Sequence, residues 1–125
     1  MAFKLKTSKR AAEIFDRIES SENLPCYTLV KLAMALSLRS KKPLQDSDFH
    51  TNTVGRELNR QTFTGDADAV YKCLMELHSD QHLTDEEFFP LHVKAHIDRG
   101  AIFLDQEQRY GDDFLIHLTE LEKSI

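Results

Sequence analysis

Hydrophobic side chains are most concentrated in residues 25–38, where only Thr28, Lys31 and Ser37 interrupt them. Pro25 opens this segment, and proline suits the first turn of a helix because its missing N–H has no partner there in any case. The segment is too short to span a bilayer. A helix that is apolar on all sides is buried on all sides. We therefore expect residues 25–38 to form the buried central helix of a soluble domain.

Apolar and polar residues alternate strictly over residues 3–7, which predicts a half-buried strand. Phe3 and Leu5 then lie on one face, and Lys4 and Lys6 lie on the other. The backbone groups of a strand need a partner. That partner is either the same strand of a second subunit or a second strand within the chain, for which residues 61–64 are the candidate.

The next element is an amphipathic helix over residues 9–20, with Ser8 as its N-cap. A turn at residues 20–23 then leads to the central helix. This order of strand, amphipathic helix, turn and buried helix is the ribbon-helix-helix pattern. In that pattern two chains pair their strands, and the outward side chains enter the major groove of DNA.

The second half of the chain is predicted to contain a long loop and three further helices. Residues 44–66 have no helical period, and a loop this long is usually functional. Asp66 is expected to cap a helix over residues 67–78 that buries Ala69, Val70, Cys73, Leu74 and Leu77. A capping box at residues 84–87 predicts a helix over about residues 85–99, in which Pro90 either introduces a kink or marks a late start, and Gly100 is expected to end it. A last helix over residues 112–123 is expected to bury Phe114, Leu115, Leu118 and Leu121. We predict a single, mainly α domain over residues 1–125 with a ribbon-helix-helix-like start.

Charge divides the chain into two parts. Residues 1–44 contain nine Lys or Arg against four Asp or Glu, whereas residues 45–125 contain seven against seventeen. A basic region on an acidic protein favours a polyanion or an acidic protein as partner, although a solvated surface gives the same pattern. Lys41 and Lys42 also suit the C-terminal end of the central helix. The DNA-binding candidates are Lys4, Lys6, Lys9, Arg10, Arg17, Lys31, Lys41 and Lys42.

No motif for catalysis, a cofactor or a metal is present. Two cysteines inside apolar runs indicate a reducing compartment, and the absence of a signal peptide or membrane span indicates a cytoplasmic protein. His92 and His96 have a spacing that can hold a metal, but the glutamate of His-Glu-x-x-His is missing. We therefore expect neither an enzyme nor a cofactor-binding protein.

Arg56, Asn59 and Arg60 lie in a segment bounded by two glycines. Two arginines four residues apart suit bidentate binding of phosphates. They equally suit a structural role, in which acidic partners tie the long loop to the helices. Of these two interpretations, we favour the structural one.

The segment Gly-Arg-Glu-Leu-Asn-Arg-Gln-Thr-Phe-Thr-Gly at residues 55–65 resembles Gly-Arg-Glu-Phe-Asn-Arg-x-Thr-Leu-Thr-Gly of the DndE family. The segment Lys-Ala-His-Ile-Asp-Arg-Gly at residues 94–100 is similar to that family's Lys-Ala-His-Ile-x-Arg-Gly. Residues 3–8 and 33–38 match in the same order. The resemblance covers most of the chain, and residues 55–65 are its most specific part.

The resemblance implies a subunit of the bacterial DNA phosphorothioation system, in which partner proteins replace a non-bridging phosphate oxygen with sulfur. It implies a non-catalytic role in binding duplex DNA, nicked duplex included, and self-association as a dimer or tetramer. The other phosphorothioation proteins are the expected protein partners, and no membrane is expected. The alternative is a protein–protein scaffold of the modification complex without direct DNA binding. The family's turn before the central helix is expected to contain glycine, where this chain has Asn23, a residue that tolerates the left-handed conformation.

Overall fold

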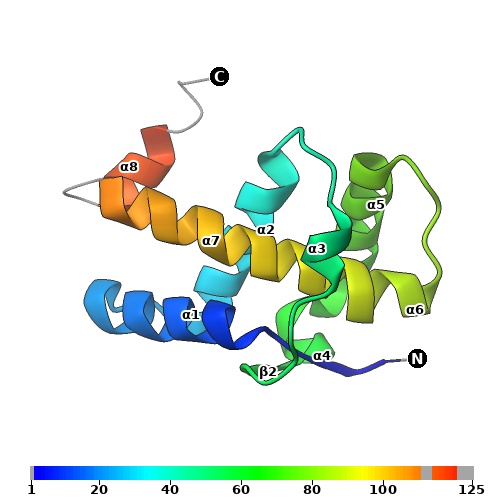
Figure 1. Ribbon diagram of the computed structural model, residues 1–125, viewed down its shortest axis with the longest axis horizontal. Coiled ribbons are helices and arrows are strands. Elements are labelled where there is room, and N and C mark those ends of the chain that lie inside the picture. The colour runs from blue at the N-terminus through cyan, green and yellow to red at the C-terminus, as the bar shows by residue number, and fades with distance from the viewer. Residues whose placement is uncertain (1, 111–113, 121–125) are drawn as a thin grey trace.

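The computed structural model describes residues 2–110 and 114–120 of the 125-residue chain. It is mainly helical with a short N-terminal strand, as the sequence predicted, and that strand belongs to a two-stranded antiparallel sheet. The central helix is α2 (Cys26–Arg39), which packs across α7 (Lys94–Tyr110) (Figure 1). Leu29, Val30, Ala33 and Met34 of α2 are fully buried. The expectation that α2 is buried on every side is wrong, because a strip with Thr28, Lys31 and Ala35 is exposed.

The crossing of α2 and α7 depends on a glycine. A Cβ atom at Gly100 would lie 1.8 Å from the backbone oxygen of Ala33, so only glycine allows the two helices to approach this closely. The prediction that Gly100 ends its helix is therefore wrong, because α7 continues through it to Tyr110. The role of this glycine is set by a neighbouring helix and not by its own.

The N-terminal strand has its partner within the chain. β1 (Lys4–Lys6) pairs antiparallel with β2 (Glu57–Asn59), so that buried Leu5 lies opposite buried Leu58. The predicted partner at residues 61–64 is wrong, because α4 (Arg60–Phe63) begins directly after β2. Phe3 is mostly exposed and does not share the buried face of Leu5, contrary to the alternation pattern.

The first helix matches its prediction. α1 (Lys9–Glu22) has Ser8 as its N-cap, and the Ser8 side chain accepts a hydrogen bond from the backbone N–H of Ala11. Asn23 ends α1 with a φ of 56°, which is the left-handed conformation expected of this turn. Ala11, Ile14, Phe15 and Ile18 face the core.

The predicted long loop contains short elements. α3 (Asp46–Phe49), β2, α4 and the 3-10 turn η1 (Gly65–Ala67) lie between residues 44 and 67. The prediction of a structureless loop is therefore wrong. The sequence pattern did not reveal these elements because each is too short to show a period. Gly55 in this segment lies against Thr7 and Ser8, the two residues between β1 and α1, where an added Cβ atom would be 2.2 Å from the backbone oxygen of Ser8.

The remaining elements are α5 (Asp68–Ser79), α6 (Asp85–Glu87), the π-helical segment η2 (Phe88–Val93) and α8 (Phe114–Glu120). The N-cap of α5 is Ala67, so the predicted capping role of Asp66 is wrong. The capping box of Thr84 and Glu87 is present. Pro90 falls within η2, the irregular segment that leads into α7. Leu118 packs against the core, whereas Leu121 and the side chains of Phe114 and Leu115 lie outside the described structure.

The prediction of which residues of α5 are buried is wrong. Met75 is the residue of α5 that is fully buried. The predicted core positions Ala69, Val70, Cys73, Leu74 and Leu77 are all exposed. The periodicity correctly indicates an apolar helix face, but α5 turns that face away from the domain.

Candidate nucleic-acid interface

Four of the predicted DNA-binding residues lie close together at the start of the chain. Strand alternation places Lys4 and Lys6 on the face of β1 opposite buried Leu5. Lys9 and Arg10 form the exposed first turn of α1, which begins directly after the strand. We call these four residues the basic N-terminal surface: Lys4, Lys6, Lys9 and Arg10.

The acidic side chains near this surface are Glu57, Asp16, Glu19 and Glu13, of which Glu13 lines pockets together with Lys9 and Arg10. Nζ of Lys4 lies 3.2 Å from a carboxylate oxygen of Glu57, in a pair that is half exposed on both sides. Arg56 holds Asp16 at 3.1 Å and Glu19 at 3.9 Å. Within the described part of the chain, Lys6, Lys9 and Arg10 have no ion pair within 4.0 Å. An exposed pair contributes little to stability, so Lys4 is also able to exchange Glu57 for a phosphate.

A second group of arginines lies where α1 meets the C-terminal part of α7. Arg17 donates a hydrogen bond to Oε1 of Gln108 at 2.8 Å and forms an ion pair with Asp105. Nε of Arg109 donates to the same Asp105 at 3.1 Å. A pocket of about 310 Å³ is lined by Arg17, Asp105 and Arg109 together with Arg10, Glu13 and Ile14. Arg109 was missed by the sequence analysis because it lies in the acidic half of the chain.

The other predicted DNA-binding residues are not part of the basic N-terminal surface. Lys31 lies on the exposed strip of α2. Lys41 and Lys42 follow the C-terminal end of α2, on the opposite side of α7 from β1 and α1 (Figure 1). The backbone there is held by Arg99, which donates to the carbonyl oxygen of Lys42 at 2.8 Å. The structure therefore divides the eight predicted residues among at least two separate surfaces.

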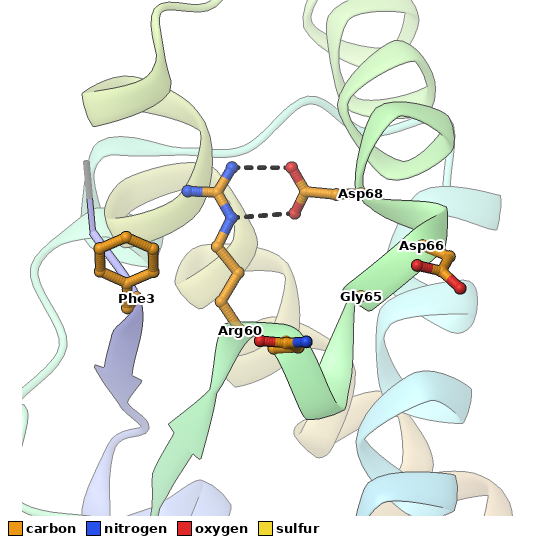
Figure 2. A pocket seen from close by; sticks show the side chains of 6 residues that line it. Phe3, Arg60, Gly65, Asp66 and Asp68 are labelled. Atoms are coloured by element: carbon orange, nitrogen blue, oxygen red, sulfur yellow. Dashed lines mark hydrogen bonds and ion pairs between the residues drawn. The ribbon is translucent and has the colours of Figure 1, made fainter.

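Arg60 is surrounded by acceptors in the interior. Its Nε and Nη2 atoms donate to both carboxylate oxygens of Asp68, at 3.0 and 2.7 Å (Figure 2). Nη1 and Nη2 donate to Asp85 at 3.2 and 2.8 Å, and Nη1 also donates to the carbonyl oxygen of Ala2 at 3.0 Å. All five N–H donors of this guanidinium group are thus engaged.

Aromatic rings and acids complete the environment of Arg60. Its Cζ atom lies 4.9 Å from the centre of the Phe89 ring and 5.5 Å from that of Phe88, within the range of a cation–π contact. Hydrogen bonds from Arg60 lower the pKa values of Asp68 and Asp85, whose anionic forms they stabilise. The adjoining pocket, of about 290 Å³, is lined by Asp66 and Asp68 as well as Arg60. Because the donors of Arg60 are all engaged, this lining offers no free basic group to bind an anion.

Arg56 and Asn59 also make contacts within the protein. The Asn59 side chain accepts a hydrogen bond from the backbone N–H of Gln61 at 3.0 Å and so caps α4. The backbone N–H of Arg56 donates to the Thr7 hydroxyl at 3.0 Å, which extends the contact between the two strands. These contacts join the ends of β1 and β2 to the surrounding elements.

The segment at residues 94–100 supplies interior polar contacts. Asp98 accepts hydrogen bonds from the backbone N–H of Ser8 at 3.0 Å and from Nζ of Lys94 at 2.7 Å. Arg99 donates to the hydroxyl and the carbonyl oxygen of Ser37, at 2.8 and 2.7 Å. This segment therefore joins α7 to the start of α1 and to the end of α2.

His96 lies beside the same Ser37. The Ser37 hydroxyl is 2.8 Å from Nδ1 of His96, and both side chains are fully buried. Arg99 donates to the Ser37 hydroxyl, whose own hydrogen is therefore available for Nδ1, and the buried Nε2 atom of His96 has no hydrogen-bond partner among the described residues. Burial, aided by the neighbouring His78 and the charge of Arg99, lowers the pKa of His96 to about 3.

Two further properties bear on function. Among residues 2–110 and 114–120, no group of three or more His, Cys, Asp or Glu side chains is arranged to hold a metal ion. His92 and His96 are instead buried in the core. In the same part of the chain, none of the helices is long and apolar enough to cross a membrane.

Comparison with known proteins gives a consistent picture. The model of a protein family described as "DNA sulphur modification protein DndE" matches residues 4–111. The crystal structure of DndE from Escherichia coli B7A, described as involved in DNA phosphorothioation modification, is similar with a TM-score of 0.65. The two chains are 14% identical, and the match covers 83% of this chain and 98% of that one, so it shows a shared fold. None of the curated proteins matches this chain.

Proposed function

The chain belongs to the DndE family, and from this premise we propose that it is a non-catalytic, DNA-binding accessory subunit of the DNA phosphorothioation machinery. The family's involvement in DNA sulphur modification is what gives the chain a DNA-related role. We propose that duplex DNA, nicked duplex included, contacts the basic N-terminal surface. The other phosphorothioation proteins are its proposed protein partners.

The observation that carries the proposal is the contrast between the basic side chains of residues 4–10 and those of the interior. Lys6, Lys9 and Arg10 are exposed, and the described residues provide no carboxylate partner for them within 4.0 Å. Exposed cations without an ion pair contribute most to the free energy of binding a phosphate, because binding releases condensed counterions and no ion pair has to be broken first. Arg60, in contrast, has no N–H left for a phosphate.

Binding of this kind is directed at the DNA backbone. Bidentate reading of base edges is best suited to the planar side chains of Arg, Asn and Gln placed in the major groove. β1 carries only lysines on its outward face, and each offers one compact ammonium group. We therefore propose contacts mostly to phosphates, with little dependence on base sequence.

A non-catalytic role is supported by where the reactive groups lie. The Ser37–His96 pair has the distance of a nucleophile and its base, but both side chains are fully buried. A substrate therefore has no access to that pair. Among the described residues, no group of three or more His, Cys, Asp or Glu side chains near the exposed basic side chains is arranged to hold a metal ion.

The test is the affinity for a fluorescently labelled duplex, measured by anisotropy with intact and nicked versions. The variant Lys6→Ala/Lys9→Ala is expected to weaken binding to both versions and to unrelated base sequences alike. The matched control, Lys41→Ala/Lys42→Ala, removes the same charge from the loop after α2 and is expected to have the smaller effect. Equal losses in the two double variants would show that net charge, and not this surface, determines binding.

A further inference from the structure

One helix of the domain exposes a continuous apolar face. Val70, Leu74 and Leu77 of α5 are 59, 43 and 73% exposed, and Cys73 is exposed between them. Residues spaced by three and four positions lie on the same side of a helix. We call these four residues the apolar α5 face: Val70, Cys73, Leu74 and Leu77. Leucine side chains exposed together along a helix are a recognised sign of an interaction site.

The orientation of α5 is fixed from its other side. Asp68 at its first position is held by Arg60, and Nε2 of His78 near its end contacts the carbonyl oxygen of Ser40 at 2.8 Å. Between these points, Met75 is fully buried and the Tyr71 ring stacks on Phe63 at 6.2 Å. Attachment at both ends prevents the helix from rotating its apolar face into the core.

Acidic residues stand at the two ends of the apolar α5 face. Asp66 lies in the 3-10 turn just before α5, four positions before Val70, and Asp80 is the left-handed residue that ends α5, three positions after Leu77. Both are exposed, and the described residues provide no ion-pair partner for either. Figure 2 shows Asp66 directed away from Arg60, in contrast to Asp68. The face is thus a hydrophobic row with an unpaired negative charge at each end.

We propose that the apolar α5 face binds an amphipathic helix of another protein, with an apolar row of about three turns and a Lys or Arg at each end. The apolar row supplies the area to be buried, and the two cations pair with Asp66 and Asp80. The two acids flank the 12 residues of α5, a helix about 18 Å long. That length sets the spacing of the cations on the partner.

The charges disfavour the pairing of this face with the same face of a second copy. Antiparallel pairing of two α5 helices would place Asp66 of one near Asp80 of the other, at both ends of the contact. Parallel pairing would place like residues side by side. Either arrangement brings carboxylates together, which costs free energy and disfavours self-pairing through this face. The same negative charges exclude the DNA backbone as its ligand.

The proposal is tested with two helical peptides of about 18 residues, stapled so that folding does not oppose binding. Both contain the same leucine row, and one has Lys and the other Glu at the two ends. Titration of each fluorescent peptide with the full chain is expected to give at least about tenfold tighter binding for the Lys peptide. Leu77→Glu is expected to weaken that binding by about tenfold or more, whereas Val54→Glu, at a residue 69% exposed elsewhere, leaves it unchanged.

The charge requirement is tested with Asp66→Asn/Asp80→Asn. Asparagine tolerates the left-handed conformation of position 80, where φ is 55°, so the helix end is preserved. This variant is expected to lose the preference for the Lys peptide. Absence of saturable binding, equal binding of both peptides, or binding unaffected by Leu77→Glu would overturn the proposal. A wild-type oligomer that Leu77→Glu converts to monomers in light scattering would assign the face to a second copy and overturn it as well.

Failure of this proposal is separate from failure of the DNA-binding proposal. Leu77→Glu is expected to bind the labelled duplex as tightly as the parent, since α5 does not contribute to the basic N-terminal surface. Conversely, Lys6→Ala/Lys9→Ala is expected to lose DNA binding and to keep its affinity for the peptide. Each proposal therefore has a variant that affects only its own ligand.

Discussion

The basic N-terminal surface and the interior around Arg60 use positive charge in opposite ways. Arg60 is almost completely buried, and every donor of its guanidinium group has an acceptor within the protein. Lys6, Lys9 and Arg10 are exposed, and they have no carboxylate partner among the described residues. The interior cation stabilises one conformation, whereas the exposed cations remain available for a ligand. Counting basic residues along the sequence does not separate these two roles.

The largest expected effect comes from removing the interior cation. Arg60→Ala leaves Asp68 and Asp85 without their partner, and breaking a largely buried ion pair from one side costs about 3 kcal/mol. We expect the free energy of unfolding in urea to fall by that amount. Affinity for the labelled duplex is expected to stay unchanged, because Arg60 has no free donor.

Arg56→Ala is the matched control for Arg60→Ala. Arg56 lies in the same segment and also pairs with two acids, but its side chain is 40% exposed. Exposed pairs contribute less than about 1 kcal/mol, so this variant is expected to be the more stable of the two. A stable Arg60→Ala variant that no longer binds DNA would show instead that Arg60 is a phosphate ligand.

The next effect concerns a basic group that the interior keeps neutral. The pKa of His96 is lowered by burial to about 3, whereas the unfolded chain takes up this proton near 6.5. Between these values the unfolded state binds more protons, so stability is full above pH 6.5 and is lost as the pH falls towards 3. The slope reaches about 1.4 kcal/mol per pH unit, or up to about 2 kcal/mol between pH 6.5 and 5.

Urea unfolding at several pH values between 7 and 5 measures this loss. The variant His96→Gln keeps an acceptor for Ser37 but has no titrating group, so its stability is expected to depend less on pH. His92, one helical turn away, has its pKa lowered by burial and contributes a loss of the same sign. Identical pH dependence in the parent and His96→Gln would contradict the assignment of this proton to His96.

Sequence patterns predicted the elements whose signals are local. Ser8 caps α1 and Asn23 ends it as expected, because both effects involve residues within one turn. β2 was missed because three residues are too few to show alternation. The apolar positions of α5 were correctly grouped on one face, but a period does not reveal whether the rest of the chain covers that face. Its exposure follows from the distant attachment points of α5.

The candidate site was predictable only in part, for the same reason. The sequence indicated Lys4, Lys6, Lys9 and Arg10 together because they are neighbours along the chain. It did not separate them from Lys41 and Lys42, which the fold places on the other side of α7. The partners of Arg60 are 8 and 25 residues away, and sequence spacing alone does not identify such pairs.

The most direct test of the central claim is the salt dependence of DNA binding. The account attributes affinity to exposed cations that release counterions from phosphates, so log affinity should fall steeply with log salt concentration. Each phosphate contact contributes about 0.9 to that slope. Lys6→Ala/Lys9→Ala/Arg10→Ala is therefore expected to flatten the slope by about 2.7 for intact and nicked duplex alike. A triple variant that binds as tightly as the parent at every salt concentration would contradict the account.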